Sequence, residues 1–282
     1  MQAVGKGETG RGKSQRIALT VDRWIWVFMA VLFIATALAG FIPRSLERLQ
    51  LIEAGKHAPF ALITHVHAVL MGSWLLIFLA QTSLVASRKL HWHQTMGIAS
   101  LVIAPAVAIS LIAITVHGVT SQLSDLTLPQ LSDQFAFAIF VQGKAILLFS
   151  LYVVWALRVR LRQPQLHKRL MVLANFVIIA AAFARIPWLP HFGLEWPYYE
   201  DLWNVLILFP VLLYDSLRAR AWLWVWLLGI SLLLPFVATY YYLGIGLPEW
   251  WQQFVAGLFG QGSLTQGKLT LTICSSRDRF TV

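Results

Sequence analysis

The sequence predicts an all-α membrane protein with a transmembrane bundle of about seven helices. Seven apolar segments of roughly 20 residues alternate with short loops, and the chain is 58% hydrophobic but only 12% charged. A helix needs about 20 residues to cross a hydrocarbon core about 30 Å thick. Continuous runs of this length favour helices over the shorter, alternating strands of a barrel. The predicted spans are 24–42, 61–86, 97–116, 135–157, 170–188, 202–217 and 222–243.

The basic residues predict the orientation of these spans. Most of the 22 Lys and Arg residues lie in the N-terminal tail or in the loops that follow spans two, four and six, whereas the loop 118–134 has none. Basic loops stay on the cytoplasmic side, so we expect a cytoplasmic N-terminus in a bacterial inner membrane. The net charge of +10 therefore indicates contact with the lipid bilayer and its anionic headgroups, and no nucleic acid.

The regions outside the spans have a different composition. Residues 1–20 are polar and rich in Gly and Lys, which predicts a disordered cytoplasmic tail. The transmembrane domain is expected over 21–245, and 246–282 is expected to form an interfacial helix around Trp250, Trp251 and Phe254 followed by a flexible outer tail. Residues 37–39 resemble a signal-peptidase site, but the preceding apolar run is long for a signal peptide, so we expect no cleavage.

A weak internal repeat predicts which spans form the core. Spans two and three, like spans four and five, read as helix, basic loop, Leu-His and apolar helix, with His93 aligned to His167. Two hairpins of the same orientation predict a four-helix core from spans two to five. Spans one, six and seven are then expected at the periphery.

The histidines are the candidate ligands. His67 lies within span two, and an ionisable residue inside a membrane segment is a candidate for function. His67, His93 and His167 lie near helix N-termini, where the helix dipole disfavours imidazolium. Neutral imidazole ligates metals, including haem iron. The simpler interpretation is that these rings meet headgroups, water or carbonyl groups. His65 and His67 are two residues apart, so only one of them is expected to face the bundle interior.

Other polar residues leave alternatives open. Lys144 in span four is suited to neutralise a haem propionate or an anionic substrate, and equally to extend its amine out of the apolar region. Asp215 is followed by Arg218, which predicts a local surface pair. The aromatic residues around Trp222 and Trp226 predict an interfacial belt.

Two short motifs carry a resemblance. The sequence 90–97, LHWHQTMG, and a looser copy at 166–171, LHKRLM, resemble a box in an uncharacterised family of predicted bacterial membrane proteins. The region 65–185 more distantly resembles the ascorbate-type transmembrane b cytochromes, whose four-helix core carries a histidine on each helix and holds two haems. The resemblance implies that the first histidine is His65 or His67, the second His91 or His93, and the fourth His167.

The third histidine of that pattern is missing. It should open span four near Phe135, where the sequence has none. His117, at the outer end of span three, is a possible substitute that the resemblance does not imply.

The leading functional hypothesis is therefore a b-type haem protein that transfers electrons, as a possible component of a membrane oxidoreductase with a redox partner or a larger membrane complex. The haem iron ligands would be His93 and His167, with His67 at a second site, His117 as its optional partner and Lys144 as an electrostatic partner. No catalytic residue is assigned. The alternatives are a non-enzymatic assembly or partner protein without a cofactor, and a small-molecule transporter that uses Lys144.

Overall fold

The computed structural model is all-α in its described part, which covers residues 5–121, 128–193 and 198–241, with residues 250, 253, 254 and 257 beyond them. The predicted interfacial helix and outer tail, 246–282, thus lie almost entirely outside the described residues. The helices are α1 (Gly5–Glu53), α2 (Leu62–Ala86), α3 (Leu90–Thr120), α4 (Leu128–Val159), α5 (Pro164–Phe183), α6 (Tyr198–Leu206), α7 (Phe209–Arg218), the 3-10 helix η1 (Arg220–Trp222) and α8 (Leu223–Tyr241).

Five of these helices are long and apolar enough to cross a membrane, so the chain is a multi-pass membrane protein. These spans are Thr20–Glu53, Leu62–Ala86, Leu90–Gly118, Phe140–Val159 and Pro164–Phe183. They correspond in order to the first five predicted spans. The predicted sixth span is divided between α6 and α7, and the seventh falls on α8. Pro210, in the first turn of α7, accounts for the division because a proline cannot donate to the preceding turn.

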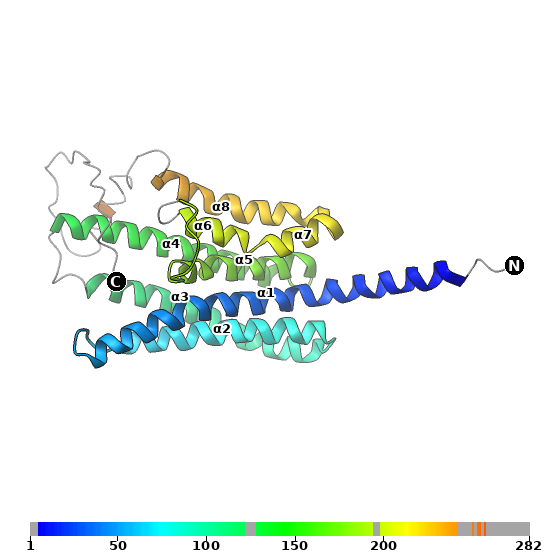
Figure 1. Cartoon of the computed structure of the whole chain (residues 1–282), viewed down its shortest axis with the longest axis horizontal. Helices are drawn as coiled ribbons and strands as arrows, with labels where there is room; N and C mark the ends of the chain where they lie inside the picture. The colour runs from blue at the N-terminus through cyan, green and yellow to red at the C-terminus, as the bar shows by residue number, and fades with distance from the viewer. Residues whose placement is uncertain are drawn as a thin grey trace.

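The long helices run nearly parallel to one axis of the molecule (Figure 1). α2 and α4 run toward the end of the bundle at which α3 and α5 begin, because short turns at 87–89 and 160–163 join each pair. We call this end the histidine end, since His93 and His167 lie in the first turns of α3 and α5. The other end is called the opposite end.

The first helix is longer and more central than its sequence indicates. α1 has 49 residues, about 74 Å at 1.5 Å per residue, and its N-terminal part projects beyond the other helices (Figure 1). The helix thus extends into the segment 1–20, where a disordered tail was expected. α1 packs against both α2 and α5, and its Met29 and Phe33 are fully buried. A four-helix core with span one at the periphery is therefore not what the structure shows.

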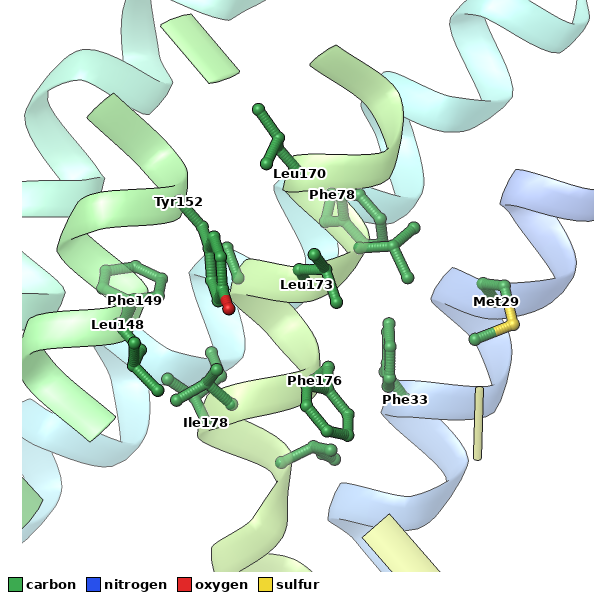
Figure 2. Close-up of a cluster of buried hydrophobic side chains, with 14 of the residues drawn as sticks. Met29, Phe33, Phe78, Leu148, Phe149, Tyr152, Leu170, Leu173, Phe176 and Ile178 are labelled. Carbon is green, nitrogen blue, oxygen red and sulfur yellow. The ribbon is translucent and has the colours of Figure 1, made fainter. Parts of the chain in front are cut away.

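The core is centred on α5, the most deeply buried of the five spans. Leu170, Leu173 and Phe176 of α5 are fully buried and face side chains from α1, α2 and α4 (Figure 2). Across this core, Trp74 Nε1 of α2 donates to Asn175 Oδ1 of α5 (3.1 Å), and Asn175 Nδ2 donates to the Met171 carbonyl (2.8 Å). A buried amide with both of its ends paired costs little and fixes the rotation of α2 against α5.

One glycine allows α1 to approach α5 closely. A Cβ atom at Gly40 would overlap the Ala182 carbonyl oxygen, so this position accepts only a residue without a side chain. Small residues at helix contacts let membrane helices approach closely and gain van der Waals packing, because lipid supplies no hydrophobic driving force between helices.

Candidate functional site

His167 is held in the first turn of α5 with one ring nitrogen engaged. Pro164 opens this helix, where its missing N–H is not needed. His167 Nδ1 lies 2.9 Å from the Ala156 carbonyl oxygen of α4. A carbonyl only accepts hydrogen bonds, so Nδ1 carries the proton and the neutral ring has its lone pair on Nε2. This is the arrangement in which a second interaction orients a ligating histidine.

His93 is half-buried in the first turn of α3, and its ring is engaged differently. The Gln81 amide of α2 satisfies its neighbours only when its nitrogen donates to His93 Nδ1 and to the His93 carbonyl oxygen (3.1 Å), while its oxygen accepts from the Gly97 N–H (2.9 Å). Nδ1 of a neutral His93 is then an acceptor, which places the ring proton on Nε2. Ligation of a metal by Nε2 therefore requires the Gln81 amide to turn over.

The two rings lie close enough for their charges to interact. The histidines that the repeat aligns thus lie at the same end of the bundle, each on a different hairpin. The charge of Arg160, in the turn before α5, also reaches His167. Among the described residues no group of three or more His, Cys, Asp or Glu side chains is placed to hold a metal ion. A haem with two axial histidines needs only two such ligands.

His67 has the same ring arrangement as His167, toward the opposite end. Its Nδ1 lies 3.0 Å from Ser110 Oγ of α3. The Ser110 hydroxyl donates its only proton to the Val107 carbonyl (2.8 Å), so it accepts from His67 Nδ1–H and leaves Nε2 as the free lone pair. His65 is exposed while His67 is half-buried, as expected for side chains two residues apart.

The remaining candidate histidines are more peripheral. His91 is exposed beside Trp92 on α3, which leaves His93 as the inward member of that pair. His117 is half-buried near the end of α3. It lies seven residues beyond Ser110, about 10 Å along the helix. No hydrogen bond or ring contact joins His67 and His117 in the described part of the chain.

Lys144 faces acidic side chains rather than the histidine pair. It is half-buried on α4, and it interacts electrostatically with Asp201 and Glu200 of α6. It lies 12 residues before Ala156, the residue that accepts from His167, which is about 18 Å along α4. An electrostatic role beside the His93–His167 pair is thus taken more readily by Arg160.

A buried ion pair that was not predicted lies at the histidine end. Arg169 and Asp215 are both completely buried, and they form a two-pronged contact: Nε donates to Oδ2 (2.7 Å) and Nη2 donates to Oδ1 (2.5 Å). Arg169 Nη1 donates to the Gln165 carbonyl (2.7 Å), and Trp226 Nε1 donates to Asp215 Oδ2 (2.6 Å). Every charged group of the pair is thus hydrogen-bonded.

Aromatic rings cover this ion pair. The Arg169 guanidinium carbon lies 5.4 Å from the centre of the Trp26 ring and 5.0 Å from that of Trp222, within the range of cation–π attraction. We call Trp26, Arg169, Asp215, Trp222 and Trp226 the Arg169 cluster. Because its members come from α1, α5, α7, η1 and α8, the cluster joins the late helices to the core.

The cluster corrects two sequence-based predictions. Asp215 is not a surface partner of Arg218, because its carboxylate is buried against Arg169, 46 residues away. Trp226 is fully buried rather than part of an interfacial belt, because its N–H completes the hydrogen bonding of Asp215. The only advance signal was an acidic residue inside an otherwise apolar predicted span.

Comparison of the whole chain with models of protein families, with curated proteins and with solved structures finds no match.

Proposed function

We propose that this integral membrane protein binds a b-type haem at the histidine end, with His93 and His167 as axial ligands, and transfers electrons within the membrane. The observation that carries the proposal is the hydrogen bond from His167 Nδ1 to the Ala156 carbonyl, beside a second histidine within electrostatic reach. The hydrogen bond leaves Nε2 of His167 without a proton, so that its lone pair can ligate iron. It also fixes the orientation of the ring from α4.

The chain's own residues have defined roles in this proposal. Ala156 holds the His167 ring and its tautomer. Gln81 would turn its amide oxygen toward His93 Nδ1, at the cost of its contact with the Gly97 N–H. Arg160 would balance the negative charge of the haem propionates. The bound haem would supply one-electron chemistry, with a potential that its axial ligands tune.

The proposed topology has seven spans with a cytoplasmic N-terminus. The segment 198–218 would run about 30 Å at 1.5 Å per residue, and α6 and α7 follow one another along the bundle axis (Figure 1). A broken helix is tolerated at membrane depth where protein surrounds the break, and Ile207 and Leu208 at this break are buried. Together with the alternating basic loops, this favours a bacterial inner membrane protein with the histidine end in the cytoplasm.

The test is haem quantitation on the purified full-length protein. We expect a reduced-minus-oxidised absorption spectrum of a b-type haem, with pyridine haemochrome analysis giving at least one haem per chain. His167→Ala and His93→Ala should each lose that haem. His91→Ala and His65→Ala alter exposed rings and serve as matched controls that retain it.

Two outcomes would change this assignment. Haem that is retained in both His93→Ala and His167→Ala would end the axial assignment. Its absence from wild-type protein, made in cells supplied with haem precursor, would remove the cytochrome proposal and leave the cofactor-free partner protein. A stoichiometry of two that falls to one in His67→Ala would add the second site.

A further inference from the structure

Within the part of the chain that the structure describes, the buried amide of Asn204 makes no hydrogen bond that would explain its position in the core. Its side chain is fully buried on α6, and neither its Nδ2 nor its Oδ1 has a hydrogen-bond partner among the described residues. Burying an amide without hydrogen bonds is costly, and the cost is highest where no bulk water is within reach. A buried amide without a protein partner is commonly hydrogen-bonded to an ordered internal water.

A carboxylate lies beside this amide. Asp201 is three residues before Asn204 on α6, and side chains at this spacing share one face of a helix with Cβ atoms about 5–6 Å apart. Asp201 is half-buried and lies in the electrostatic field of Lys144.

Tyr152 is a useful contrast. Its hydroxyl is also buried without a partner in the described part of the chain, but it points into a cluster of apolar side chains that includes Phe149 and Leu173 (Figure 2). A buried water needs two to four polar partners. The Tyr152 hydroxyl offers one, whereas Asn204 and Asp201 together offer an N–H group and two kinds of acceptor.

We propose that Asn204 and Asp201 form an internal water site on one face of α6, and that this water hydrates the Asp201 carboxylate. One water would accept from Asn204 Nδ2 and donate to Asn204 Oδ1, which lie on the same edge of a primary amide. Its second proton would go to the Asp201 carboxylate. Both unpaired polar atoms of Asn204 are thereby hydrogen-bonded, and the half-buried Asp201 carboxylate keeps a polar environment. This inference is independent of the haem proposal.

The direction in which Asn204→Leu changes the Tm tests the water site. Asn204→Leu keeps the shape of the side chain but removes the water's anchor, so we expect the Tm of the full-length protein in detergent to fall by about 2–10 °C. If the Asn204 amide were buried without any hydrogen-bonded water, the same substitution would leave the Tm unchanged or raise it, and the proposal would be overturned. Tyr152→Phe is the matched control, for which an unchanged or raised Tm is expected.

A second background separates hydration from packing. In Asp201→Ala protein the bridging water has lost one partner, so the decrease in Tm caused by Asn204→Leu should shrink to less than half. An equal decrease in both backgrounds would mean that leucine only packs badly, and would overturn the proposal. Should Asn204→Leu not fold, Asn204→Ala leaves room for water and is expected to fold. The decrease in Tm caused by Asn204→Ala should be smaller in Asp201→Ala protein than in wild-type protein. An equal decrease in both backgrounds would count against the site.

Discussion

The Arg169 cluster and the Lys144–Asp201 pair both bring opposite charges from different helices within electrostatic reach, but they differ in how their polar atoms are hydrogen-bonded. In the first, a guanidinium and a carboxylate are fully buried and make direct hydrogen bonds to each other, to a backbone carbonyl and to an indole N–H. In the second, the groups are half-buried and interact through their charges, beside an amide with no protein partner among the described residues. Direct pairing makes the first cluster a rigid joint, and its absence leaves the second accessible to water.

The largest expected effect comes from breaking the rigid joint. Asp215→Asn keeps the shape of the side chain but leaves Arg169 buried without a counter-charge, so we expect the free energy of unfolding to fall by about 3–5 kcal/mol. Denaturant unfolding of the detergent-solubilised protein measures this loss. A loss below about 1 kcal/mol would contradict the view that the pair is dry.

The paired replacement sharpens the same test. Replacing both charges with apolar residues, as in Arg169→Met with Asp215→Leu, should recover most of the stability lost by Asp215→Asn, because no uncompensated charge remains.

A smaller effect is expected for the Lys144–Asp201 pair. A double-mutant cycle with Lys144→Met and Asp201→Asn should give a coupling energy of about 1–2 kcal/mol, because water and partial exposure weaken the attraction. The equivalent cycle with Glu200→Gln serves as a comparison, since Glu200 also interacts with Lys144. Additive losses in both cycles would show that Lys144 is not held by these carboxylates.

The smallest effect is expected for an exposed pair outside both clusters. Arg44 Nη1 donates to Glu47 Oε2 (2.9 Å) with both side chains largely in contact with solvent. Arg44→Gln should change the free energy of unfolding by no more than about 0.5 kcal/mol. A change comparable to that of Asp215→Asn would mean that surface charge, rather than burial, sets these energies.

Hydropathy predicted the first five spans because their apolar composition is a local property. That at most one of His65 and His67 faces the bundle interior also followed from local helix geometry, and the structure has His65 exposed and His67 half-buried. What the sequence could not reveal was pairing at long range. Asp215 was assigned to Arg218, its neighbour in the chain, because nothing local indicates Arg169. The position of α1 was missed for the same reason, since a helix that is apolar on all sides does not show which side meets protein and which meets lipid.

The candidate site was only partly predictable as well. Sequence reasoning selected His93 and His167, and the structure adds the Ala156 carbonyl and the Gln81 amide that orient their rings. Neither could be named in advance, because a backbone carbonyl has no sequence signature and a glutamine in a span has many possible partners. Asn204 falls in the predicted sixth span, where its lack of a partner became evident only from packing.

The ion pair of the Arg169 cluster also has a consequence for biosynthesis. Asp215 follows Arg169 by 46 residues, so at about 5–20 residues per second the ribosome needs about 2–9 s to supply the counter-charge. During this delay α5 would enter the bilayer with an unpaired cation. Trp26, made long before, is then the only ring of the cluster already in place, and it lies within cation–π distance in the finished protein. Until α7 and α8 are made, the contact with Trp26 of α1 would thus be the one aromatic contact of the cluster that can stabilise the Arg169 charge.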